Sequence, residues 1–159
     1  RRPEPSDVVE RGWTDVGGGV QDRPMHTTNY FDTFIAVAED TAATAATEPP
    51  TRASPSVAEL TYRMIAENPY RFTSDDVIFA VWADRRDIPP GERESARAEF
   101  FAKGQPCMRS SDLGKRYGWG VHADAEGRIA LVPVESEEYA RMAAGEGGVT
   151  VTRAMRSKR

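Results

Sequence analysis

The chain has 159 residues, of which 39% are hydrophobic and 29% are charged, and this is the size and composition of one globular domain. No apolar run approaches the roughly 20 residues that a membrane-spanning helix needs, which argues against membrane insertion. The single cysteine, Cys107, excludes an internal disulfide and a cysteine-rich metal site. The sequence therefore predicts a cytoplasmic protein without a metal or a cofactor.

Charge is distributed unevenly along the chain. The formal net charge is -4, yet residues 26–102 hold seven basic and thirteen acidic side chains, whereas residues 103–134 hold five basic and three acidic ones. The last eleven residues add four basic side chains and no acidic one. Such a separation can attract an anionic partner, although a basic tail is most often only a solvated chain end.

The N-terminal part of the chain divides into three segments. Residues 1–24 combine prolines, charges and a glycine triplet without hydrophobic periodicity, which predicts a disordered extension, and the natural start is predicted at Met25. Residues 25–159 are then one domain. It opens with a strand over residues 33–38, indicated by aromatic and β-branched residues, and continues into a flexible surface loop over residues 41–56, which is rich in Thr, Ala and Pro.

Two helices are predicted next, and each begins after a residue that can cap its first turn. The first helix starts either at Ser54, which Pro55 follows, or at Ser56 with Glu59 three residues later, because a serine hydroxyl can accept a hydrogen bond from a free amide. This helix should stop before Asn68 because a proline follows. Thr73, followed by a serine and two aspartates, predicts a second helix that runs to Arg86. A strand over residues 77–83 is the alternative, but the spacing of the apolar residues favours the helix.

The rest of the chain predicts short elements separated by glycines. A third helix over residues 92–103 is expected to end at Gly104 in the left-handed conformation, and Gly127 suits the positive φ of a hairpin turn. The other predicted elements are a helical turn over residues 113–116, hairpin strands over 119–123 and 128–134, a helix over 136–144 and a strand over 149–152. Strands and helices do not alternate regularly, so the predicted fold is α+β: a small, mostly antiparallel sheet with about four helices packed on it, in a single domain.

Four segments, taken in order, resemble one protein family. They are MHTTNYFDTFIAVAED, NPYRFTSDDVIF, SSDLGKRYGWGVHADAEGRIALVPVESEEY and the closing AMRSKR. From Met25 to Arg159 the chain is similar to a family of small, mostly bacterial proteins classed only as a domain of unknown function. The Thr- and Ala-rich loop before Ser56 departs from the family pattern, because it is longer or more degenerate. The resemblance implies a start at Met25 and implies no activity, cofactor or site residue.

The candidate catalytic residues are His122 and Cys107. An imidazole in a strand could act as a general base or a single metal ligand, but no second ligand stands at metal spacing, and a hydrogen-bonding histidine between strands is the simpler interpretation. Arg109 near Cys107 would favour a nucleophilic thiolate, whereas a free cysteine is more often a small buried apolar group. A small cytoplasmic enzyme that uses His122 with Cys107 or with a carboxylate is one hypothesis for the function.

Cationic and aromatic side chains form the candidate binding surface. Cations can contact carboxylates or phosphates and rings can stack on flat ligands, although buried rings beside close-packed glycines would explain the same pattern structurally. The candidate ligand-binding residues are Arg71, Lys115, Arg116, Tyr117, Trp119 and Arg156. The leading hypothesis is a non-catalytic domain that binds a small anionic ligand or a protein partner. Nucleic-acid binding is a further alternative, which the negative net charge disfavours.

Overall fold

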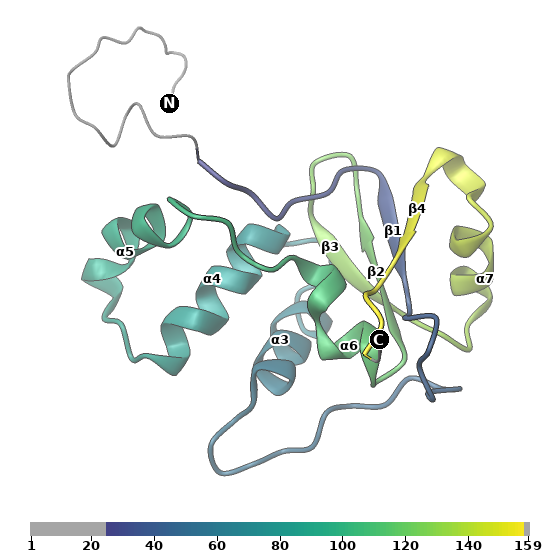
Figure 1. Ribbon diagram of the computed structural model, residues 1–159, viewed down its shortest axis with the longest axis horizontal. Helices are drawn as coiled ribbons and strands as arrows, with labels where there is room; N and C mark the ends of the chain where they lie inside the picture. The colour runs from purple at the N-terminus through teal and green to yellow at the C-terminus, as the bar shows by residue number, and fades with distance from the viewer. Residues whose placement is uncertain (1–24, 158–159) are drawn as a thin grey trace, which may run out of the picture.

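The computed structural model describes residues 25–157, and the predicted disorder of residues 1–24 lies outside them. Within the described residues, four strands form one sheet in the order β3-β2-β1-β4 (Figure 1). The strands are β1 (Thr33–Ala36), β2 (Trp119–Ala123), β3 (Ile129–Pro133) and β4 (Thr150–Arg153). The predicted hairpin is β2 and β3, which pair antiparallel with Trp119 opposite Pro133.

Five α helices accompany this sheet in residues 25–157. They are α3 (Val57–Ala66), α4 (Ser74–Arg85), α5 (Arg93–Phe100), α6 (Asp112–Lys115) and α7 (Glu137–Ala143). The helices α3, α4 and α6 lie on one side of the sheet and α7 lies on the other, while α5 packs beside α4, away from the strands (Figure 1). The predicted α+β fold is therefore confirmed. None of these helices is long and apolar enough to cross a membrane.

The sheet is mixed, which corrects the prediction of a mostly antiparallel one. The strand β4 runs parallel to β1, with Thr150 beside Thr33 and Arg153 beside Ala36. After β3 the chain passes through α7 and returns in the direction of β1. Side chains alternate between the two faces of a strand whether it pairs parallel or antiparallel, so the sequence pattern of β4 did not reveal its direction.

Local capping fixes the starts of α3 and α4 at positions that the sequence predicted. The hydroxyl of Ser56 accepts a hydrogen bond from the amide of Glu59, at 3.1 Å, and starts α3. The pair Thr73 and Asp76 forms a reciprocal capping box at the start of α4, so the strand alternative for residues 77–83 is wrong. Such bonds join residues only three positions apart, and for that reason a sequence can predict them.

The end of α5 differs from the prediction. The helix stops at Phe100, and Gly104 is not in the left-handed conformation. The side-chain amide of Gln105 donates a hydrogen bond to the Phe100 carbonyl at 2.7 Å, and Phe101 turns into an apolar cluster where only 3% of it is exposed. A side-chain cap and aromatic burial thus end the helix in place of a glycine.

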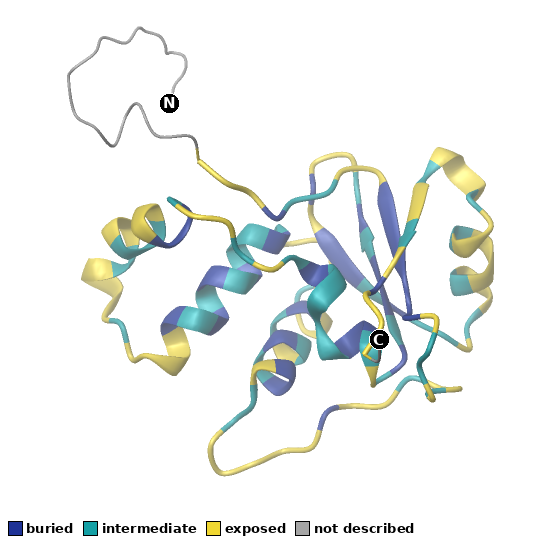
Figure 2. Ribbon diagram, in the orientation of Figure 1, coloured by how far each residue is buried: buried dark blue, intermediate teal, exposed yellow. Residues whose placement is uncertain are grey.

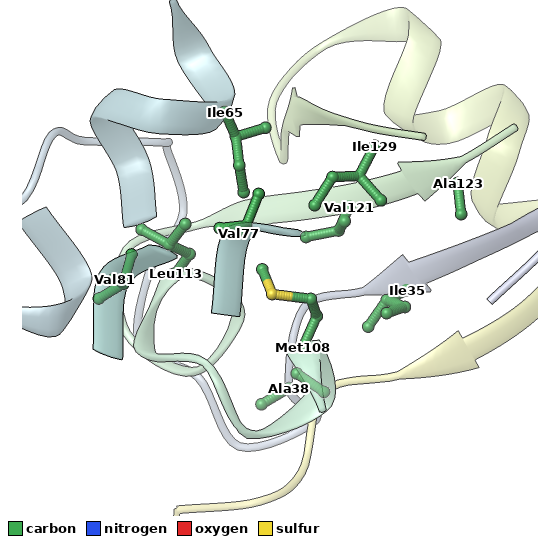
Figure 3. Close-up of a cluster of buried hydrophobic side chains, with 11 residues drawn as sticks. Ile35, Ala38, Ile65, Val77, Val81, Met108, Leu113, Val121, Ala123 and Ile129 are labelled. Carbon is green, nitrogen blue, oxygen red and sulfur yellow. The ribbon is translucent and has the colours of Figure 1, made fainter. Parts of the chain in front are cut away.

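The main core lies between the sheet and the three helices on its first side (Figure 3). The strands contribute residues such as Ile35, Val121 and Ile129, and Ile65 of α3 and Leu113 of α6 cover them. The core on the other side of the sheet is smaller, because only the short helix α7 covers it, with partly buried side chains. Much of the outer surface of α7 is exposed (Figure 2). The alternation of side chains along β2 therefore decides which residues face the helical layer.

Candidate functional site

A pocket opens between α3, α4 and the chain that follows α5. It has a volume of about 260 Å³, just below the range of roughly 300–1,000 Å³ that is usual for small-molecule sites. Apolar side chains such as Val57 of α3, Ile78 and Val81 of α4, and Met108 line much of it. Part of the α4 face that predicted a helix from its spacing is therefore the wall of this pocket.

Two arginines also line the pocket, at the C-terminal end of α4. Arg85 is the last residue of the helix and Arg86 caps it, and both are exposed. The guanidinium of Arg86 lies 4.6 Å from the ring centroid of Trp82, a third lining residue. Neither arginine forms an ion pair with another residue in 25–157. The helix dipole favours cations at this position without any ligand, yet the hydrogen-bond donors of both groups remain available.

Cys107 lines the same pocket and is half-buried. Its sulfur lies 3.4 Å from the hydroxyl oxygen of Tyr30. Burial raises the pKa of Tyr30 above its ordinary value, and the contact with Cys107 acts in the same direction, while Arg109 opposes both. The phenol beside the thiol is therefore protonated at neutral pH and is not a general base for it.

His122 lies on the other side of the sheet. Its Nδ1 is 2.7 Å from the hydroxyl of Tyr70, and the two rings are nearly perpendicular, with centroids 5.6 Å apart. Tyr70 has a φ of 58° and donates its amide to the Ile129 carbonyl, at the outer edge of β3. Burial raises the pKa of Tyr70, as do the carboxylates of Glu138 and Asp124. The phenol is therefore protonated at neutral pH, and its hydroxyl shares one hydrogen bond with Nδ1, whose direction is set by the imidazole tautomer.

The two candidate catalytic residues do not share a site. The side chain of His122 points away from those of Val121 and Ala123, its neighbours on β2. Those two residues pack in the main core with Met108, which follows Cys107 in the chain. The sheet therefore separates the imidazole from the thiol. Within residues 25–157, no three or more His, Cys, Asp or Glu side chains are grouped so that they could hold a metal ion.

The aromatic residues of the predicted binding surface hold a loop in place. The indole nitrogen of Trp119 donates to the Thr47 carbonyl at 2.8 Å, and its ring lies 5.4 Å from that of Tyr62. The Thr47 amide in turn donates to the carbonyl of Tyr117 at 2.9 Å. The side chains of Tyr117 and Trp119 also pack against the main core. These contacts attach the loop of residues 41–56 to the start of β2, and the predicted flexibility of that loop stays a prediction.

The cationic residues of the predicted surface are dispersed. Arg116 is exposed after α6 and Lys115 is half-buried at its end. Arg156 lies near them in the fold, because residues 109 and 114 contact the C-terminal segment, but its guanidinium is 2.9 Å from the Glu39 carboxylate. Arg71 follows Tyr70 at the Ile129 end of β3, opposite the end of the hairpin where Trp119 lies. These side chains do not form one continuous surface.

The fold and the pocket together define a class: an α+β protein with a helical layer on one face of a mixed sheet and a small pocket within that layer. The chain belongs to a family of unknown function, DUF6157, whose model matches residues 25–159. This confirms the resemblance carried by the sequence segments. No curated protein and no solved structure matches the chain. The family brings no assigned activity, so function is argued from the pocket.

Proposed function

We propose that the chain is a non-catalytic binding protein for a small, largely apolar molecule with one carboxylate, held in the pocket between α3 and α4. The observation that carries the proposal is the presence, in one pocket, of an apolar wall and of two arginines, Arg85 and Arg86, that have no ion pair with a described residue. The predicted class of ligand, a small anion, is kept. We propose the pocket as its location in place of the surface predicted from the sequence, which consists of Arg71, Lys115, Arg116, Tyr117, Trp119 and Arg156.

The chemistry of the pocket suits such a ligand. Burial of apolar ligand surface contributes about 25 cal/mol per Å² removed from water, and an arginine can bind a carboxylate with two parallel hydrogen bonds. Stacking on Trp82 restricts the guanidinium of Arg86 before the ligand arrives, so less conformational entropy is lost on binding. The Cys107 thiol lines the pocket, but none of the described lining residues is a His, Asp or Glu that could act as its base, and for this reason we propose binding without turnover.

The test is calorimetric titration of the purified chain with hexanoate, alongside hexylamine and hexanol. We expect hexanoate to bind best, and we expect Arg85→Gln and Arg86→Gln each to weaken its binding about tenfold, because each removes a charged hydrogen bond. Arg71→Gln and Arg116→Gln are matched controls, since both arginines are exposed and lie outside the pocket.

Two results would contradict the proposal. If hexanoate does not bind, or binds no better than hexylamine, the pocket is not a carboxylate site. If only the Arg71 and Arg116 variants lose binding, the ligand lies on the surface predicted from the sequence. Nucleic-acid binding is tested separately by retention of mixed oligonucleotides at low salt, and we expect none. The proposal places the protein in the cytoplasm, which the single cysteine supports.

A further inference from the structure

A second hollow lies next to the pocket, between α4 and α5. Its volume is about 580 Å³, and Ile88 and Ala96 line it together with Glu99 and Lys103. Three side chains line both the pocket and the hollow: Trp82, Phe100 and Gln105. The two spaces are therefore neighbours with one shared wall.

The shared wall consists of side chains from three separate positions. The rings of Trp82 and Phe100 lie 4.8 Å apart and are tilted by 44°. The amide of Gln105 is held against the wall by its hydrogen bond to the Phe100 carbonyl. Gln105 is only half-buried and lies outside the helices, so its side chain can change rotamer without disturbing one, whereas Trp82 stays packed between Phe100 and Arg86. A chain of methylene groups could pass such a wall once one side chain turns.

We infer that the pocket and the hollow form one two-chamber site for an elongated monocarboxylic acid. This inference rests on the proposed function. The carboxylate binds at Arg85 and Arg86, which line only the first chamber, and the alkyl chain passes the wall into the second. The second chamber is lined by one acid and one base, Glu99 and Lys103, whereas Arg85 and Arg86 give the first chamber two cations with no acid among its described lining residues, so the carboxylate is assigned to the first.

The test compares hexanoate with dodecanoate below its micelle concentration. Each methylene group that leaves water strengthens binding by roughly fourfold, so we expect dodecanoate to bind at least about a hundredfold more tightly than hexanoate. Ala96→Phe fills only the second chamber and should weaken dodecanoate about tenfold or more while leaving hexanoate unchanged. Val57→Trp is the matched control, because Val57 lines only the first chamber and is 50% exposed, and it should weaken both acids.

A second variant tests the same chamber independently, in case Ala96→Phe fails to fold. Lys103 is exposed and lines only the second chamber, so Lys103→Trp narrows that chamber from its solvent side and should also weaken only dodecanoate. The inference is overturned if dodecanoate binds no tighter than hexanoate, or if both filling variants bind dodecanoate like the unmodified chain. In either case arginine-dependent binding of hexanoate would leave the proposed function standing. If neither acid binds, both proposals fail.

Discussion

The pocket at the end of α4 and the glycine-rich segment of residues 114–122 both bring aromatic rings and cationic side chains together, but they use them differently. Trp82 lines a pocket, and Arg86 is stacked on its ring. The indole N–H of Trp119 donates a hydrogen bond to the Thr47 carbonyl, and the ring of Trp119 packs against the core. An aromatic and cationic run in a sequence therefore indicates a binding site only where the fold leaves a hollow beside it.

The largest expected effect comes from Gly120→Ala, which tests whether the glycine-rich segment is structural. An added Cβ would lie 2.6 Å from a Phe34 ring carbon and 3.0 Å from a Tyr139 ring carbon. We expect the free energy of unfolding in urea to fall by about 1–3 kcal/mol, because the site is already filled. Gly91→Ala is the control, since its Cβ would meet nothing within 4 Å. Equal stability of the two variants would remove the packing argument.

Alkylation of Cys107 reports on the pocket directly, because it is the only cysteine in the chain. At a hexanoate concentration of ten times the Kd, we expect iodoacetamide to react about tenfold more slowly, which corresponds to about 1.4 kcal/mol. Mass spectrometry follows the reaction. The Arg86→Gln variant at the same hexanoate concentration should show only about twofold protection, because its roughly tenfold weaker binding leaves about half of the pocket occupied. An unchanged rate in the unmodified chain would mean that the ligand does not occupy the pocket.

The stability of α4, which forms one wall of the pocket, should depend on pH through Asp76. Burial alone would raise the pKa of this carboxyl, but hydrogen bonds from the Thr73 amide and the Arg97 guanidinium, with the charge of Arg97, outweigh burial and lower the pKa. The carboxylate therefore stabilises the fold above the unfolded-state pKa of about 3.9, and this contribution is lost as the pH falls through the lower folded-state pKa.

We accordingly expect Asp76→Ala to lower the free energy of unfolding by about 1 kcal/mol at neutral pH, as the loss of a helix cap does. Urea unfolding at a series of pH values should show the difference from the unmodified chain shrinking below about pH 4, where the carboxyl becomes protonated. Glu146→Ala is the control, because Glu146 is exposed and has no ion pair with another described residue. A difference that stays constant down to acid pH would contradict the assignment.

The smallest effect is expected from Trp119→Phe, which keeps a ring and removes one hydrogen-bond donor. The loss should be about 0.5–1 kcal/mol, accompanied by faster hydrogen exchange of the Thr47 amide in the attached loop. Hexanoate affinity should not change. Trp82→Phe is the matched variant, and it should weaken hexanoate binding while leaving exchange at Thr47 as it was. If instead Trp119→Phe weakened hexanoate binding and Trp82→Phe accelerated exchange at Thr47, Trp119 would be the ligand-binding tryptophan and Trp82 the one that holds the loop.

Much of the secondary structure could be predicted because its causes are local. Ser56 and Thr73 each accept a hydrogen bond from an amide three residues later, and Gly127 adopts the positive φ that the hairpin turn requires. The candidate site could be predicted only in part. The apolar spacing of α4 predicted a helix face, but Arg85 and Arg86 were not among the candidate residues, because nothing near them in the sequence signals a hollow.

By itself, then, the sequence determined where helices begin, where the hairpin turns and that the chain has an α+β fold, since capping, glycine conformation and periodicity act within a few residues. Only the tertiary structure decided the direction of β4, the partner of His122 and the position of the pocket. Tyr70 is 52 residues from His122, and the pocket walls come from residues 57–61, 78–86 and 100–111. Such neighbours are brought together by burial of a shared core, which no short stretch of sequence specifies.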